Sequence, residues 1–233
     1  MIDLHFWPTP NCYKVSILLE ELGLPYTVMP VHIGKGEQFA PQFEAISPNG
    51  KVPAILDHDG PDGEPIALFE SGAIMIYLAD KADAFLPRDT RPRMAVLQWL
   101  MFQMGGVGPM LGQAHHFRRY AKESVPYAVE RYTREAARLY RVMDKRLGES
   151  EFLAGDYSIA DMAVYPWLRP YRWQGQELSD FANLQRWYSA VRERPAVQRG
   201  LAVMKERLDR NRNKPTGKSW DVLFGQRPHG DAA

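Results

Sequence analysis

Apolar residues change their spacing along the first part of the chain, and each spacing predicts a type of element. They recur at every second position of residues 2–6, which is the period of a strand. From residue 11 to residue 22 they recur every three or four positions, which is the spacing of a helix. We expect Asn11 to cap the start of this helix and Gly23 to end it.

The same analysis predicts five further elements before residue 83. Strands are expected over residues 26–31, 52–57 and 66–70, and helices over residues 41–46 and 71–82. The resulting order, β-α-β-α-β-β-α, is the plan of a thioredoxin-like α/β domain, which we place at residues 1–83. Pro53 cannot donate to the sheet, and we expect a cis bond before it. The N–H and C=O of Val52 would then be available to an extended peptide.

Helical spacing dominates the rest of the chain, after a linker at residues 85–92. We therefore place an all-α domain at residues 93–210 and a C-terminal tail at residues 211–233. Glycines and a proline interrupt the first predicted helix, residues 93–119, where we expect a kink or a break. Further helices are predicted over residues 126–148, from a capping box at residues 158–161, over residues 183–193 and over residues 196–208. The tail is expected to be loose, with Trp220, Leu223 and Phe224 able to dock on the body.

Composition and charge narrow the functional classes. The 233 residues carry a net charge of +1, so nothing indicates a nucleic-acid or membrane surface. We see no signal peptide and no apolar run near the ~20 residues that a membrane span needs. The one cysteine, Cys12, excludes an intrachain disulfide, which fits a cytoplasmic protein. No cysteine and histidine residues have the spacing of a metal site, and we expect none.

The junction of strand 66–70 with helix 71–82 has a distinctive chemistry. A helix start leaves backbone N–H groups unpaired and carries the positive end of the helix dipole, which favours an anion beside the Ser71 hydroxyl. Glu70 is an acceptor suited to an ammonium group. A corner that holds both charges fits the α-amino-acid end of a small peptide. The alternative is that Ser71 is only a helix cap and Glu70 an ordinary surface charge.

Five short segments together resemble one known family. They are TPNCYKV at residues 9–15, GKGEQF at 34–39, NGKVPAIL at 49–56, LFESGAI at 68–74 and GGVGPMLGQ at 105–113. The pattern resembles the cytosolic glutathione transferases, and among them the bacterial nu-class enzymes, also described as glutathione-dependent disulfide-bond oxidoreductases. The resemblance covers roughly residues 1–210.

The resemblance implies a role for each of seven residues. It places Thr9 and Asn11 at the glutathione sulfur, where they would stabilise the thiolate. The γ-glutamyl end of glutathione would bind Glu70 and Ser71, and its backbone would pair with Val52. Gln38 would bind the carboxylate at the glycine end. Arg131 would reach glutathione from the second domain. Taken without the resemblance, Thr9 and Asn11 read as a turn threonine and a capping residue, and Arg131 as an exposed helix residue.

Cys12 is the competing candidate for the reacting thiol. It lies in the first turn of a helix, where the pKa of a thiol falls. However, the chain has no second cysteine to resolve a mixed disulfide, and the residue after Asn11 is expected to face the core. We therefore interpret Cys12 as a buried, inert residue.

The predicted reaction is the reduction of small disulfides by bound glutathione, without an enzyme cysteine. One alternative is a transferase that conjugates glutathione to electrophiles, with peroxidase as a side activity. Another is a non-catalytic protein that binds glutathione. The resemblance also implies a homodimer, for which Tyr77 and the segment 100–104 are candidate apolar contributors.

Overall fold

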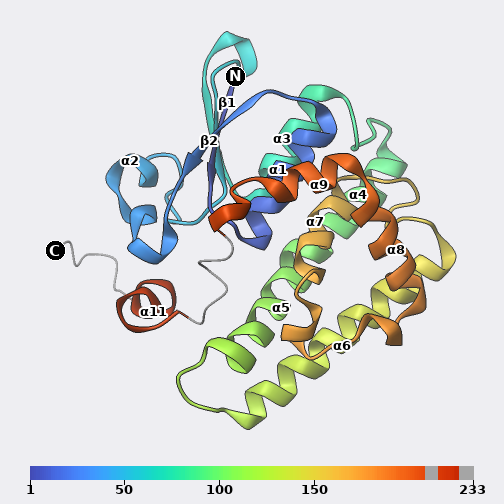
Figure 1. The fold of residues 1–233 in the computed structure, drawn as a ribbon. Coiled ribbons are helices and arrows are strands. Elements are labelled where there is room, and N and C mark those ends of the chain that lie inside the picture. Colours follow the sequence, from blue (N-terminus) through green and yellow to red (C-terminus); the bar gives the residue numbers. More distant parts are fainter. Residues whose placement is uncertain (208–214, 226–233) are drawn as a thin grey trace.

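The structure is a computed structural model that describes residues 1–207 and 215–225. A small sheet lies at one end and a group of long helices at the other (Figure 1). The sheet has the strand order β2-β1-β3-β4. Its strands are β1 (Ile2–Phe6), β2 (Tyr26–Pro30), β3 (Ala54–Asp57) and β4 (Ile66–Phe69). β1 runs parallel to β2 and antiparallel to β3, which pairs antiparallel with β4.

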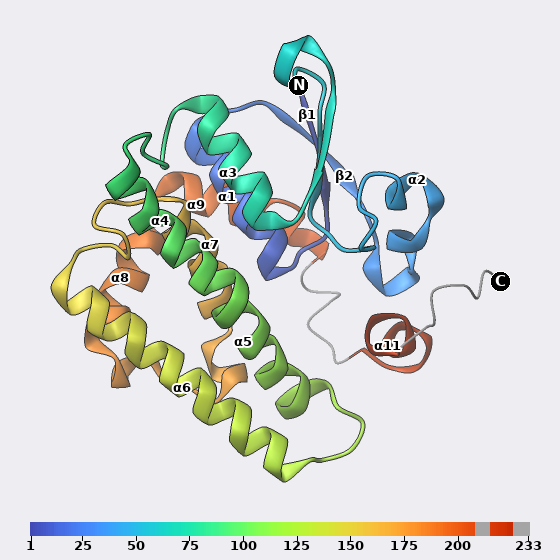
Figure 2. The same ribbon diagram turned by 180° about the vertical axis from the view of Figure 1, so that it is seen from behind.

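Three α-helices accompany the sheet in the predicted order. They are α1 (Pro10–Leu22), α2 (Pro41–Glu44) and α3 (Ser71–Ala82). Short 3-10 helices lie between them: η1 (Ile33–Lys35), η2 (Glu37–Phe39) and η3 (Pro61–Gly63). α1 and α3 lie together on one side of the sheet and α2 on the other, as opposite views show (Figures 1 and 2). This confirms the predicted thioredoxin-like plan.

Three of the predicted boundaries around the sheet were wrong by one or two residues. Thr9, and not Asn11, caps α1, because its hydroxyl oxygen accepts a hydrogen bond from the Cys12 N–H at 3.3 Å. Pro10 fits the first helical position, where no N–H is needed. β3 begins only at Ala54, after the proline, and β4 ends at Phe69, before Glu70.

The rest of the described chain is almost entirely helical, which confirms the predicted all-α second part. Its α-helices are α4 (Thr90–Phe102), α5 (Gly108–His115), α6 (Pro126–Glu149), α7 (Ile159–Leu168), α8 (Ala182–Glu193), α9 (Pro195–Ala202) and α11 (Gly217–Phe224). Two π-helical segments are η4 (Gln103–Val107) and η5 (His116–Tyr120). Two 3-10 helices are η6 (Tyr171–Gln174) and η7 (Leu178–Asp180).

The glycine-rich interruption widens the helical path and does not break it. α4 continues into α5 through the π-helical segment η4, which contains Gly105 and Gly106. A side chain at Gly108 would lie 2.9 Å from the amide nitrogen of Gln103. Glycine therefore lets the chain turn while Gln103 stays buried beneath it. π-helical turns of this kind frequently occur at functional sites.

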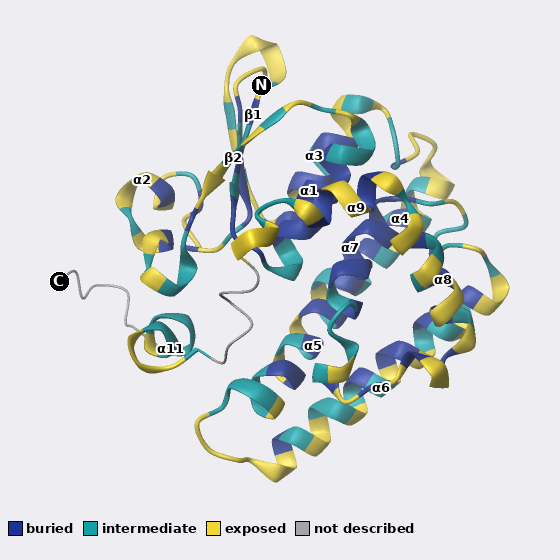
Figure 3. Cartoon of the chain, in the orientation of Figure 1, coloured by how far each residue is buried: buried dark blue, intermediate teal, exposed yellow. Residues whose placement is uncertain are grey.

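α1 lies at the centre of the molecule. It packs against α3 from its own part of the chain and against α7 and α9 from the helical part. α1 and α7 are buried along most of their length (Figure 3). At Gly200 of α9 an added Cβ would lie 2.6 Å from the Cα of Ile17, so the backbones of α1 and α9 are in close contact. The Ser16 hydroxyl donates to the Gly200 carbonyl at 2.9 Å.

The capping box at the start of α7 was predicted correctly. Ser158 and Asp161 cap each other's backbone groups. Asp161 is fully buried and also accepts hydrogen bonds from the Leu153 N–H at 3.0 Å and the Trp187 indole at 2.8 Å. Burial raises the pKa of this carboxyl to about 6, against the effect of these donors.

Two predictions near the C-terminus need correction. The helix predicted over residues 196–208 ends at Ala202, because Val203 leaves helical backbone geometry and Met204 has a positive φ of 52°. Part of the tail is ordered as α11, which packs against η1. Its Trp220 indole donates to the Tyr120 carbonyl at 2.8 Å, and Phe224 stacks on Tyr120. The remaining predictions for the tail concern residues 208–214 and 226–233, which lie outside the described residues.

Candidate functional site

The start of α1, the start of β3 and the end of β4 are close together at one end of the sheet. α1 follows β1 after a short turn, and β1 lies beside β3. The β3–β4 register pairs Ala54 with Phe69, so the residues just before β3 and just after β4 leave the hairpin at the same end. This topology places Thr9, Asn11, Val52, Glu70 and Ser71 around one corner.

Glu70 and Ser71 have unusual local environments. Glu70 has a φ of 68° and a ψ of 112°, an uncommon conformation for a non-glycine residue, and its side chain is exposed. Strained backbone of this kind concentrates at functional sites. Ser71 is buried at the first position of α3, where helical N–H groups are unpaired. The corner therefore presents a carboxylate beside a helix start whose unpaired N–H groups are suited to an anion.

Thr9 and Asn11 each have one polar atom held by the protein. The Thr9 hydroxyl oxygen accepts from the Cys12 N–H, so its own hydrogen can point elsewhere. The Asn11 Oδ1 accepts a hydrogen bond of 2.9 Å from the Trp167 indole. Because indole is only a donor, the Asn11 NH2 group must face away from Trp167. Thr9 and Asn11 are both partly exposed, and both can donate to an anion at the start of α1.

Trp167 is held by a second layer of side chains. His115 stacks on Trp167 with ring centroids 6.0 Å apart. The Gln174 amide donates to the Trp167 carbonyl at 2.7 Å and lies 3.0 Å from His115 Nε2. Burial, with a smaller contribution from Arg119, lowers the pKa of His115 to about 4, so this ring is neutral at physiological pH. The sequence analysis did not predict this contact, because nothing in the spacing of Trp167 points to Asn11.

Cys12 points into the core, as predicted. Its side chain is fully buried between α1 and the sheet. Burial raises the pKa of the thiol to about 12, and the smaller effects of Thr9, the Trp7 backbone and Lys14 do not offset it. A thiol of this kind is protonated at neutral pH and has no access to a ligand at the corner.

Val52 and Gln38 complete the predicted peptide-binding groups. The Val52–Pro53 bond is cis, as predicted. Within the described residues, the Val52 backbone N–H and C=O make no hydrogen bond to the protein, so both are available. Gln38, on η2, lies beside the turn that leads to Val52, because a side chain at Gly50 would contact its carbonyl at 3.5 Å. Gln38 Oε1 is buried and has no hydrogen-bond partner among residues 1–207 and 215–225.

Arg131 is the one predicted site residue that this chain does not bring to the corner. It is exposed on α6 and lines a hollow of about 590 Å³ between α5 and α6. All residues that line this hollow belong to those two helices.

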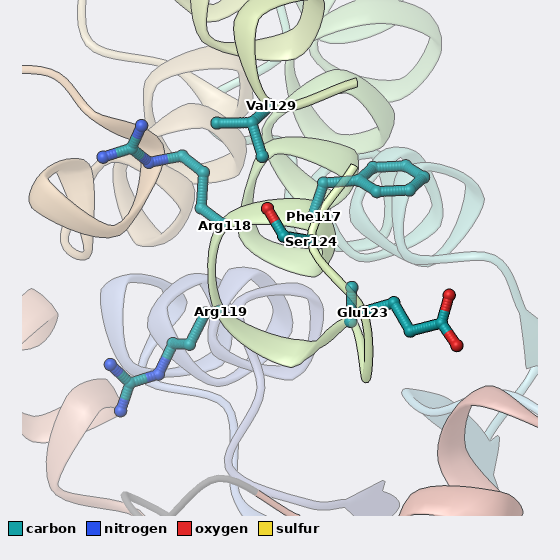
Figure 4. Close-up of a pocket in the computed structure, with 7 residues that line it drawn as sticks. Phe117, Arg118, Arg119, Glu123, Ser124 and Val129 are labelled. Atoms are coloured by element: carbon teal, nitrogen blue, oxygen red, sulfur yellow. The ribbon is translucent and has the colours of Figure 1, made fainter. Parts of the chain in front are cut away.

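A second hollow of about 340 Å³ lies at the turn between η5 and α6 (Figure 4). Its lining includes Phe117, Arg118 and Ser124 but no predicted site residue.

Lys14 was missed by the sequence analysis. It is buried one turn after Asn11, and its ammonium donates to Gln103 Oε1 at 2.5 Å and to Ser71 Oγ at 3.3 Å. The sequence carried a signal, because Lys14 is four residues before Leu18 and so lies on the apolar face of its helix.

No three or more histidine, cysteine, aspartate or glutamate side chains in residues 1–207 and 215–225 converge as a metal site. In the same ranges, every helix is too short or too polar to cross a membrane.

Comparisons with known proteins show which family this chain belongs to. Residues 9–81 match the family model described as glutathione S-transferase, N-terminal domain, and residues 108–195 match the corresponding C-terminal domain. Disulfide-bond oxidoreductase YfcG of Escherichia coli is 50% identical over 215 residues, which cover 91% of this chain and 99% of that protein. The chain belongs to the glutathione transferase family.

Solved structures of similar proteins extend the family assignment to the fold. A Burkholderia graminis glutathione transferase, solved with two glutathione molecules per subunit, is 46% identical. The match has a TM-score of 0.84 and covers 88% of each chain. A Pseudomonas putida glutathione transferase, solved with one glutathione disulfide per subunit, is 44% identical with a TM-score of 0.84. It covers 87% of this glutathione transferase and 91% of the Pseudomonas chain.

Proposed function

We propose that this glutathione transferase reduces small disulfides with glutathione, and that bound glutathione supplies every reacting thiol. The observation that carries this proposal is the start of α1. There, Thr9 and Asn11 present donors to an anion while the only cysteine of the chain is fully buried. The 50% identity to a protein named disulfide-bond oxidoreductase supports the choice of reaction.

Each end of glutathione has matching groups at the corner. Glu70 accepts hydrogen bonds from the ammonium of the γ-glutamyl group, and Ser71 with the start of α3 binds its carboxylate. The free N–H and C=O of Val52 pair with the peptide backbone as a short added strand. Gln38 binds the carboxylate at the glycine end. We assign Arg131 a glutathione contact only in an assembled dimer, because the hollow it lines is formed by α5 and α6 alone and includes no residue of this corner.

The reaction proceeds by two thiol–disulfide exchanges. The thiolate of bound glutathione attacks one sulfur of the disulfide, forming a mixed disulfide and releasing the other sulfur as a thiolate. A second glutathione thiolate then attacks the glutathione sulfur of the mixed disulfide. The products are glutathione disulfide and a second substrate thiol. Thr9, Asn11 and the start of α1 favour the thiolate over the thiol, which raises the fraction of reactive glutathione at neutral pH.

The competing function is conjugation of glutathione to electrophiles, since it uses the same thiolate. The test compares turnover of 2-hydroxyethyl disulfide with conjugation of chlorodinitrobenzene by the same preparation. We expect the disulfide to be the better substrate by kcat/KM. Faster conjugation would make the protein a transferase in the narrow sense, and glutathione binding without either turnover would make it a binding protein.

We also propose that the protein is a nu-class enzyme that acts in the cytoplasm as a homodimer. The cytoplasm holds glutathione in its reduced form, which the reaction consumes.

The proposed dimer is supported by two exposed methionines of α4. Met94 and Met101 lie seven residues apart on one face of that helix and are 42% and 51% exposed. Leu100 and Gln103, in the segment predicted to contribute, are buried and cannot.

A further inference from the structure

The proposed mechanism gives no role to the buried ammonium of Lys14. Its side chain is 1% exposed. Its Nζ donates to Gln103 Oε1 at 2.5 Å, to Ser71 Oγ at 3.3 Å and to Met104 Sδ at 3.3 Å. Within the described residues it forms no ion pair. All its hydrogen bonds therefore go to neutral groups, and a buried charge without an ion-pair partner is costly.

The groups around Lys14 come from three elements. α1 itself contributes the Cys12 thiol, and the start of α3 contributes Glu70 and Ser71. η4 contributes Gln103 and Met104, which do not titrate. Burial lowers the pKa of Lys14 to about 7, although the charge of Glu70 acts in the opposite sense. Lys14 is thus poised to gain or lose its proton near neutral pH.

The contact with Ser71 controls where that hydroxyl points. Because the Lys14 ammonium has no acceptor, Ser71 Oγ must accept the hydrogen bond between them. The Ser71 hydrogen is then directed elsewhere. Its only other protein partner in the described residues is the weak acceptor Met104 Sδ at 3.7 Å. A carboxylate at the start of α3 is a much better acceptor.

We propose that Lys14 is a positioning residue for the γ-glutamyl carboxylate. Lys14 orients the Ser71 hydroxyl toward the carboxylate and places a buried positive charge near the start of α3. This inference rests on the proposed function, since it assumes that glutathione binds with this end at Ser71. The ligand class it specifies is a free α-amino acid carboxylate, as opposed to an ester or amide at the same position.

A measurable consequence is the uptake of a proton on binding. The arriving carboxylate stabilises the charged form of Lys14, so the pKa of Lys14 rises in the complex. The affinity for the ligand is therefore highest at pH values below the pKa of Lys14 in the free protein. It falls as the pH rises from that value toward the pKa of Lys14 in the complex. For one coupled group the fall is at most about tenfold per pH unit.

The experiment uses S-methylglutathione, which has the carboxylate and the ammonium but no thiol to ionise. Calorimetric titrations at pH 7 in two buffers of different ionisation enthalpy give the number of protons taken up. The wild-type chain should take up a fraction of a proton, and Lys14→Met should take up none beyond the contribution of the ligand's own amine. At pH 6 Lys14→Met should bind about ten- to a hundredfold more weakly, as expected for loss of a charged hydrogen-bond donor. This gap should narrow at pH 8.5.

Two further variants make the result decisive. Lys145→Met removes an exposed lysine of α6 and should behave as the wild type. Lys14→Gln keeps a donor beside Ser71 and replaces Lys14→Met if that variant does not fold. If the wild type binds without proton uptake, or if the neutral variants keep it, Lys14 has no such role. If the wild type does not bind S-methylglutathione at all, the proposed function itself fails.

Discussion

At the scale of single residues, the corner relies on orientation as much as on residue type. Asn11 can face an anion with either end of its amide, and only the amine end stabilises it. The Trp167 indole, as a pure donor, selects the useful orientation. Lys14 does the same for the Ser71 hydroxyl. The residues proposed to bind glutathione were predicted from the sequence, whereas the residues that orient them are distant in sequence from the groups they orient and were not predicted.

The orienting role of Trp167 gives a first prediction. Trp167→Phe removes the donor but keeps an aromatic ring, so the Asn11 amide can rotate. Turnover should fall about five- to tenfold, the size expected for one hydrogen bond, and the pH profile should move to higher pH. The loss should disappear in an Asn11→Ala background, since the two residues act together. Trp99→Phe, on α4, is the matched control. An equal loss in both backgrounds would show that Trp167 acts independently of Asn11.

The burial of Cys12 gives a second prediction. Cys12→Ser should keep most of the disulfide reductase activity, because the thiol is inaccessible and its pKa is raised to about 12. Thr9→Ala and Asn11→Ala should lower turnover, by up to about 10²–10³ for a preorganised anion site. Mass spectrometry of the enzyme during turnover tests whether Cys12 takes part in the reaction. A glutathione adduct that forms rapidly on Cys12, together with an inactive Cys12→Ser, would overturn the thiol-free mechanism.

At the scale of elements, period and capping residues predicted the order of strands and helices but not where each one joins the next. α3 and the capping box of α7 begin where expected, because Ser71 and Ser158 mark those starts locally. The start of α1 was misplaced, since Thr9 and Asn11 are both good caps and only the fixed φ of Pro10 separates them. The π-helical turn at η4 depends on Gln103 packing beneath Gly108, a contact that local sequence does not show.

The contact between α1 and α9 gives a third prediction. Gly200→Ala should destabilise the protein by about 1–3 kcal/mol, because the new methyl group meets the backbone of Ile17 at 2.6 Å. Urea unfolding monitored by tryptophan fluorescence measures the change. Gly105→Ala is the control, since its Cβ meets nothing within 4 Å. If both variants unfold at the same urea concentration, the two helices can separate without cost.

At the scale of the whole molecule, the site is built by both parts of the chain. Thr9, Val52, Glu70 and Ser71 come from the sheet-containing part, whereas Trp167 and Gln103 come from the helices. The family was predictable from short motifs, and both fold types from the spacing of apolar residues. The domain limits at residues 83, 93 and 210 stay predictions. The position of Arg131 could not be predicted from the sequence. Helical spacing indicates that Arg131 is on an exposed helix face, but not which other part of the protein that face lies against.

Assembly gives a fourth prediction. Light scattering at micromolar concentration should give a mass of twice 26.7 kDa. Met101→Glu should shift the protein toward the monomer, because it places a charge on the exposed apolar face of α4. Lys145→Met, on α6, should leave the mass unchanged. A fully active wild-type monomer would contradict the proposed dimer.

The central place of α1 also bears on how the chain is made. Ser16 and Gly200, which meet at the α1–α9 contact, are 184 residues apart. During translation α1 leaves the ribosome among the first elements, but the helix that covers it is among the last. The nascent thioredoxin-like part therefore carries a bare apolar helix face for most of synthesis, which is the kind of surface that chaperones bind. A chain that stops before α9 would keep that face permanently, so we expect prematurely terminated products to aggregate or be degraded.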